Sequence, residues 1–109
     1  MFYQCKIKNV DMSNWKHSPN ARMKNMFSNS EVENVIFGDI SNVYNMDSAF
    51  VGCKNLKSVT MTYPLTKLLS NYTMFHSVNT EGTFYYNPEY DYSMIIEQLP
   101  DTWKAVPLS

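Results

Sequence analysis

The side chains of this chain that could carry chemistry are few: its 109 residues include two cysteines, two histidines and ten acids. A catalytic thiol or a metal pair needs a histidine or an acid beside the cysteine. Cys5 and Cys53 occupy the same position in two copies of a repeated pattern, whereas His17 and His76 fall in other parts of it. The cysteines therefore predict neither a metal site nor a nucleophile.

The acids are as dispersed as the histidines. Asp11, Asp39 and Asp47 lie in different parts of the repeat, and Glu31 and Glu33 flank a predicted strand on its solvent side. An enzyme needs titratable groups that converge, and the chain also lacks a glycine-rich phosphate loop and a nucleophile elbow. We therefore expect a protein that is not an enzyme and that binds no cofactor.

The repeat itself is the strongest pattern in the chain. Three copies begin at Phe2, Phe27 and Phe50, and a fourth, degraded copy begins at Met74-Phe75. The apolar positions of one copy recur 23 to 25 residues later in the next. A period in this range is typical of leucine-rich-repeat solenoids, in which each unit buries its apolar face against its neighbours.

Each unit divides into two halves. Residues 23–27 and 46–50 carry apolar side chains at i, i+3 and i+4, which predicts a short helical turn. Residues 32–37 and 56–61 end in the alternation of a short strand. We expect an α/β solenoid of about 3.5 repeats with a parallel sheet on one face. Two apolar columns would fill it, one of phenylalanines and one of the strand residues Val10, Val35 and Val59.

This register also predicts the state of the cysteines. Cys5 and Cys53 would lie two coils apart, about 10 Å, with Ser30 between them. A disulfide needs Cα atoms within about 7 Å. We expect two free, buried thiols.

The C-terminal stretch departs from the repeat. Residues 82–86 read as a final strand, residues 90–99 have helical spacing that ends at Pro100, and residues 103–107 read as a short extended segment. Solenoids need a different terminal unit to cover the last open coil. We assign residues 1–81 to the repeats and 82–109 to a cap within the same domain.

Composition limits the partners. The net charge is −1 and the pI is near 6.0, so no basic surface predicts nucleic acid. No apolar run is long enough to span a membrane, and residues 1–6 do not read as a signal peptide. The first repeat begins partway through a unit, which predicts an open edge. A preceding domain or a second copy, making a homo-oligomer, would cover it.

Two groups of residues are candidates for binding a protein or a glycan. The first is a cluster of tyrosines in the tail, which could contact a partner or pack the cap onto the last strand. The second is the exposed face of the sheet, whose expected side chains include Lys8, Asp11, Ser58 and Thr60. The candidate binding residues are Tyr85, Tyr86, Tyr90, Tyr92, Glu33 and Lys57.

With the repeats aligned, the chain resembles the BspA-like leucine-rich repeats of bacterial surface antigens. The resemblance rests on a turn that ends in Met-Phe, a Gly-Cys bend, and a strand followed by Ser-x-Trp. The matching segments are Met23-Lys-Asn-Met26-Phe27, Gly52-Cys53-Lys-Asn-Leu56 and Val10-Asp-Met12-Ser13-Asn14-Trp15. The ending, Gly82-Thr-Phe84 and Pro100-Asp-Thr-Trp103, resembles a terminus of the same family.

This resemblance implies an adhesion or binding module that is extracellular or on a cell surface. A second interpretation is a structural or receptor-binding component of a bacteriophage virion, such as a fibre or decoration protein. The sequence leaves both open.

Overall fold

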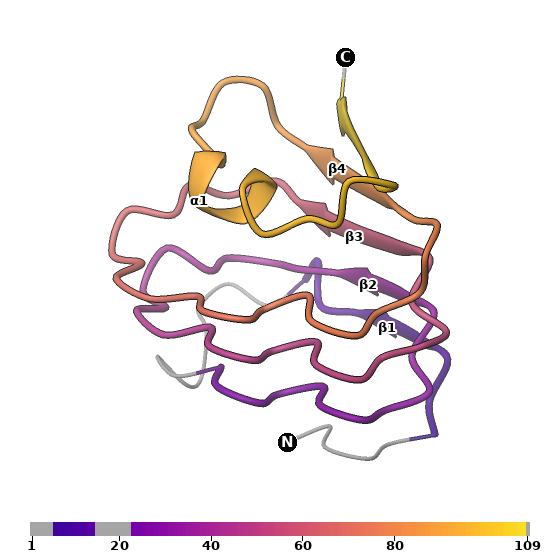
Figure 1. The fold of residues 1–109 in the computed structure, drawn as a ribbon. Helices are drawn as coiled ribbons and strands as arrows, with labels where there is room; N and C mark the ends of the chain where they lie inside the picture. The colour runs from indigo at the N-terminus through magenta and orange to yellow at the C-terminus, as the bar shows by residue number, and fades with distance from the viewer. Residues whose placement is uncertain (1–5, 15–22, 109) are drawn as a thin grey trace.

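Five short parallel strands stack side by side along one side of a coiled chain (Figure 1). The structure is a computed structural model that describes residues 6–14 and 23–108. The strands pair in chain order, β1 to β5, and one short helix precedes β5. The elements are β1 (Asn9–Asp11), β2 (Asn34–Ile36), β3 (Ser58–Met61), β4 (Thr83–Tyr86), α1 (Ser93–Ile96) and β5 (Lys104–Pro107).

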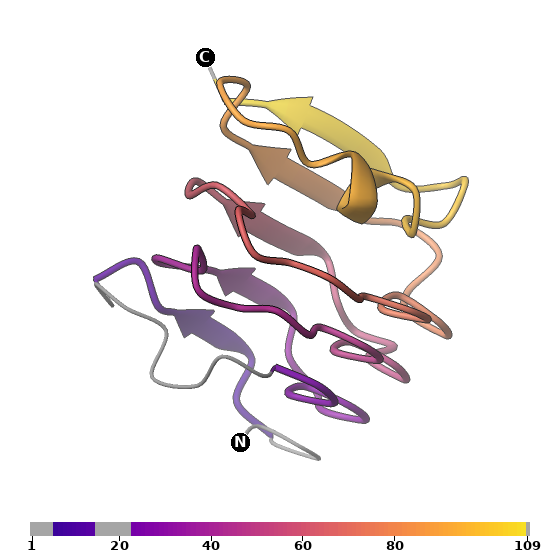
Figure 2. The ribbon, with the colours of Figure 1, turned by 90° about the vertical axis from the view of Figure 1, so that its left-hand side faces the viewer.

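The strands align as the repeat predicts. Val10 pairs with Val35, Val35 with Val59, and Val59 with Phe84. These four side chains are buried, and the residues on either side of them in β1 and β2 are more exposed. Each coil adds one strand beside the previous one, and both views show the coils stacked from the N-terminus to the C-terminus (Figures 1 and 2). The predicted parallel solenoid is confirmed, although it contains little helix.

The opposite side of the molecule consists of residues 23–30, 46–53 and 71–77, which we call the turn wall. In chain order, these three segments are the first, second and third coils of the turn wall. Strands β1 to β5 form the strand wall. The turn wall is a run of tight turns rather than the helical turns expected from the sequence. In the first coil, the N–H groups of Met26, Ser28 and Ser30 each donate to the carbonyl three residues earlier. Asn25 and Asn29 adopt positive φ, which a helix does not tolerate.

The turn wall has its own inter-coil hydrogen bonds. Alternate N–H groups of one coil donate to carbonyls of the next coil, as strands do in a parallel sheet. The N–H groups of Asn25, Phe27 and Asn29 reach the carbonyls of Asp47, Ala49 and Val51 at 2.8–3.0 Å. The next coil repeats the arrangement toward the third, so both walls hold the coils together.

A column of phenylalanines lies under the turn wall. The ring centroids of Phe27 and Phe50 are 5.3 Å apart with an angle of 2° between planes, and those of Phe50 and Phe75 are 5.4 Å apart at 8°. All three residues are buried. Trp103 closes the column, with its ring 5.6 Å from Phe75. The predicted phenylalanine column is therefore confirmed for its described members; Phe2 lies outside the described residues.

Cys53 is a free and buried cysteine, as predicted. Its Sγ donates to the carbonyl of Phe27 at 2.8 Å, and the hydroxyl of Ser30 lies 3.5 Å from the sulfur. The thiol is thus a small packing residue that links two coils. Cys5, its counterpart in the first repeat, lies outside the described residues.

The last part of the chain closes one end of the coil. Phe84 in β4 and Ile95 in α1 are fully buried, and β5 pairs in parallel with β4. Trp103 lies flat against Gly82, where an added Cβ would come within 2.3 Å of the indole ring. The indole N–H donates to the carbonyl of Asn79 at 2.8 Å. The segment read as merely extended, residues 103–107, is the fifth member of the sheet.

Two further features of the first repeat bear on the predictions. The first repeat, for which an open edge is predicted, has Ile7 half exposed, whereas its Val10 and Met12 are buried. Trp15 and His17 lie outside the described residues. In the parts of the chain that the structure describes, no helix has the length and apolar character needed to cross a membrane.

Candidate binding surface

The outward side of the strand wall, which we call the outer face, carries two parallel rows of side chains. Alternation along each strand directs one set of residues into the core and the next set outward. Because the strands are in register, outward residues from different repeats line up across the sheet. The rows are Asn9, Asn34, Ser58, Thr83 and Lys104, and then Asp11, Ile36, Thr60, Tyr85 and Val106.

The first row is polar and partly tied together. The Nδ2 of Asn34 donates to the Oδ1 of Asn9 at 2.8 Å, and the hydroxyl of Ser58 donates to the Oδ1 of Asn34 at 2.7 Å. These bonds run along the sheet from coil to coil and fix the side-chain rotamers. A row held in this way presents hydrogen-bonding groups with little freedom left to lose on binding.

The second row mixes apolar and polar groups. Ile36 and Val106 are more than one-third exposed, and Thr60 and Tyr85 are half-buried between them. Asp11 ends the row, and hydrogen bonds from the side chain and then the backbone of Ser13 lower the pKa of its carboxyl. A short apolar strip with an aromatic ring and flanking polar groups suits contact with a protein or a glycan.

The two charged candidates lie where the strands begin. The Nζ of Lys57 lies 3.2 Å from the Oε1 of Glu33, and both side chains are partly exposed. The backbone places them side by side, because the N–H of Lys57 donates to the carbonyl of Glu33. They are an ion pair at the border of the outer face, and any partner would have to compete with that pairing.

The four tail tyrosines do not form one surface. Tyr92 is buried, its ring lies 5.8 Å from Phe84, and its hydroxyl donates to the carbonyl of Tyr63 at 2.7 Å. Burial, and to a lesser degree Tyr90, raises the pKa of Tyr92 to about 12. Tyr86 stacks on Phe84. Tyr92 is thus a core residue and unavailable to a ligand, and Tyr86 mainly packs the cap.

The remaining two tyrosines are accessible in different places. Tyr85 points outward from β4, between Thr60 and Val106 in the register. Tyr90 is 39% exposed in the turn before α1. Ile36 and Val106 were not predicted as surface residues. For Ile36 the signal was present, because it stands between the inward positions Val35 and Phe37.

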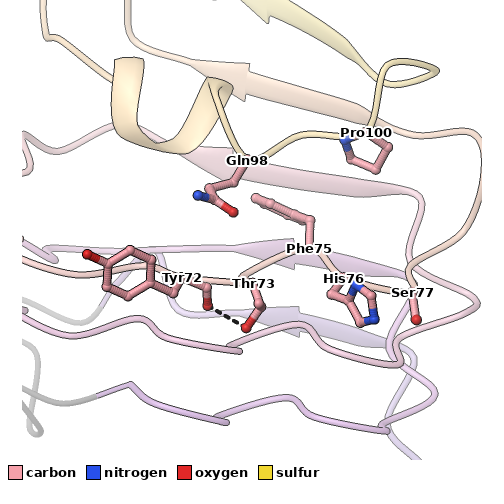
Figure 3. A pocket seen from close by; sticks show the side chains of 7 residues that line it. All are labelled: Tyr72, Thr73, Phe75, His76, Ser77, Gln98 and Pro100. Atoms are coloured by element: carbon pink, nitrogen blue, oxygen red, sulfur yellow. Dashed lines mark hydrogen bonds between the residues drawn. The ribbon is translucent and has the colours of Figure 1, made fainter.

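A hollow lies away from the outer face, between the third coil of the turn wall and the segment after α1 (Figure 3). It encloses about 520 Å³. Gln98 and Pro100 lie on one side of it, and residues 72–77 lie on the other. We call this hollow the cap groove. Its lining residues are Tyr72, Thr73, Phe75, His76, Ser77, Gln98 and Pro100.

Neither surface brings together groups for acid–base or metal chemistry. Within residues 6–14 and 23–108, no three His, Cys, Asp or Glu side chains gather as a metal site requires. Burial raises the pKa of the Cys53 thiol, against smaller opposing hydrogen bonds from Ser30, so the thiol resists forming a nucleophilic thiolate.

Comparison with known families adds one finding. A family model described as "Mycoplasma protein of unknown function, DUF285" matches residues 1–86. The chain belongs to this family. The DUF285 match ends at the last residue of β4, so it covers the described coils and four of the five strands, while α1 and β5 lie beyond it. Comparisons with curated proteins and with solved structures find no match.

Proposed function

We propose that this DUF285 protein is a non-enzymatic binding module that recognises a protein or glycan at a microbial surface through the outer face of its sheet. The observation that carries the proposal is the row formed by Ile36, Thr60, Tyr85 and Val106. Four strands contribute one side chain each, and the row leaves an aliphatic and aromatic strip accessible to solvent.

The energetics of contact favour this strip over the rest of the candidate residues. Binding energy concentrates in a few aromatic and aliphatic side chains surrounded by polar groups. Tyr85 is the only candidate tyrosine that lies in such a row among the described residues. The polar row beside it, tied by Asn34 and Ser58, would supply hydrogen bonds without further ordering.

The resemblance to BspA-like repeats supports the location and the kind of partner. Repeats of that type occur in bacterial surface proteins linked to adhesion. The match to DUF285 agrees with a bacterial repeat protein, and that family's description assigns no activity. The absence of convergent titratable groups in the described residues supports a role without catalysis.

The test is a screen of the purified chain against an array of glycans and an array of extracellular host proteins. Once a ligand is found, Tyr85→Ser and Ile36→Ser should each weaken binding about tenfold or more, which corresponds to about 1.4 kcal/mol. Tyr44→Ser is the control, because Tyr44 is exposed to about the same extent as Ile36 and lies outside the strands that form the outer face. Equal affinity of all three variants and the wild type would exclude the outer face.

A further inference from the structure

The cap groove lies where the turn wall stops. In the second coil, the N–H groups of Ser48, Phe50 and Gly52 donate to the carbonyls of the third coil at 2.9–3.0 Å. The corresponding groups of the third coil belong to Thr73, Phe75 and Ser77. Among the described residues, these three N–H groups have no protein acceptor.

The third coil nevertheless has the same local conformation as the second. Thr73 and Ser77 adopt positive φ of 52° and 61°, and Ser48 and Gly52 do so at 57° and 77°. The N–H of His76 donates to the carbonyl of Thr73, just as the N–H of Val51 donates to that of Ser48. The free donors therefore point toward the C-terminal side of the coil. This is the side on which Gln98 and Pro100 border the groove (Figure 3).

The cap replaces a fourth coil only in part. At the start of the third coil, the side chain of Asn71 donates to the carbonyl of Met94 at 2.8 Å. Under the wall, Trp103 covers the ring of Phe75. Between these two contacts, no backbone segment in the described part of the cap pairs with residues 73–77, and the groove occupies that stretch.

We propose that the cap groove binds a short peptide segment of another polypeptide, whose backbone carbonyls accept from the N–H groups of Thr73, Phe75 and Ser77. This site is separate from the outer face and does not depend on the function proposed above. Recognition would be mainly through the backbone, as when a strand is added to a sheet edge. Tyr72 and Gln98 would contact the side chains of the peptide.

The spacing of the donors favours a peptide over a glycan. The three donors are two residues apart in sequence, and the carbonyls of Tyr72, Met74 and His76, which satisfy the equivalent donors of the second coil, have the same interval. Twice in this molecule, three equivalent donors are already satisfied by the backbone of a neighbouring coil. Sugar hydroxyls can also accept hydrogen bonds, but in both coils where such donors are satisfied the acceptors are backbone carbonyls.

The capped column also argues against a second copy of the chain as the occupant. A coil stacked here in register would bring its own large residue onto the column of Phe27, Phe50 and Phe75. Trp103 already occupies that position. A short peptide segment need not place a large residue there, and the volume of about 520 Å³ is suited to such a segment.

The experiment uses a library of random 12-residue peptides selected on the full chain, with the selected peptides then synthesised and titrated. NMR should show downfield shifts of the Thr73, Phe75 and Ser77 amide protons. Their hydrogen exchange should slow at least tenfold, whereas exchange at Ser48, Phe50 and Gly52 should not change. Replacing the accepting amides of the peptide by esters should weaken binding about tenfold.

A pair of variants separates the groove from other sites. Gln98→Trp fills the groove and should abolish binding of the selected peptides. Glu97→Trp is the control, because Glu97 is the exposed neighbour and does not line the groove. Tyr85→Ser should leave peptide binding unchanged, because Tyr85 lies on the outer face. The test of the groove is therefore independent of the test of the outer face.

Several outcomes would overturn the proposal. One is that no peptide is enriched on the wild-type chain. Another is that the selected peptides bind Gln98→Trp as tightly as the wild type, or that their shifts map to the outer face. A saccharide from the glycan array that protects the three amides, with no peptide doing so, would assign the groove to a glycan instead.

Discussion

The strand wall and the turn wall come from the same repeats, yet they end differently. The strand wall passes from the coils into the cap without a break, because β4 and β5 keep the register of β1 to β3. The turn wall stops after its third coil, where Asn71 donates to the carbonyl of Met94 and the ring of Phe75 packs against Trp103. The cap therefore continues the sheet on one side and leaves backbone donors open on the other.

This difference shows that covering the apolar core and providing hydrogen-bond partners for the backbone N–H groups are separate requirements. Trp103 completes the apolar column without supplying any backbone partner to the third coil. In the strand wall one element does both, since β4 buries Phe84 and pairs with β3. Variants placed in each wall and in the cap can test this separation.

The largest expected effect is in the column under the turn wall. Phe50→Ala removes a fully buried ring stacked between Phe27 and Phe75. It should lower the free energy of unfolding by about 3–5 kcal/mol. The matched strand-wall variant Val59→Ala removes a smaller buried side chain and should cost about 2 kcal/mol. Chemical denaturation of the two variants measures the loss of unfolding free energy in each. Equal losses would contradict the expectation that the phenylalanine column contributes more to stability than the valine column.

A smaller effect concerns pH and the cap. Burial raises the pKa of Tyr92 from 10.0 to about 12. Between these values the unfolded chain loses the phenolic proton while the folded chain keeps it, so stability should fall as pH rises from about 10 toward 12. Tyr92→Phe removes this contribution and, at neutral pH, loses the bond to the carbonyl of Tyr63, about 1 kcal/mol.

Denaturation at a series of alkaline pH values checks this dependence. The wild type should lose more stability than Tyr92→Phe over the same pH range. Parallel slopes for the two proteins would show that the buried phenol does not titrate as the structure requires.

The smallest effect is expected at the border of the outer face. Lys57→Ala breaks the ion pair with Glu33, whose partners are both partly exposed. An exposed pair contributes about 0.2–1 kcal/mol, so the loss should be within that range and should shrink in high salt. Glu33→Ala should give a similar value. A loss above 2 kcal/mol from either variant would contradict the view that this is an exposed ion pair with a small contribution to stability.

The sequence predicted the parts of the fold that repeat. The recurrence of Phe27, Phe50 and Phe75 located the column, and that of Val10, Val35 and Val59 set the strand register. It could not separate a helical turn from a run of tight turns, because both place apolar residues at i, i+3 and i+4. The distinction depends on positive φ at positions such as Ser48 and Thr73, where the residue types give no hint.

The candidate sites were harder to predict. Alternation through Phe84, Tyr85 and Tyr86 could have shown that only Tyr85 faces outward. The burial of Tyr92 depends on how the cap folds back, which no periodicity encodes. The cap groove has no sequence pattern at all, because it is defined by hydrogen bonds that one coil makes and the next does not.

The coil-to-coil hydrogen bonding has a consequence for how such proteins can change over generations. Among the described residues, the backbone hydrogen bonds of both walls join each coil to the coil before it and the coil after it, and Asn71 joins the last coil of the turn wall to the cap. A tandem duplication in the gene that copies one whole coil would therefore lengthen the protein and leave both of its ends as they are. An insertion of one residue within a strand or a turn-wall segment would move the later side chains of that segment to the opposite face, whereas the spacing between strands already varies from 24 to 25 residues. Large differences in length between members of the family should therefore be close to multiples of one coil.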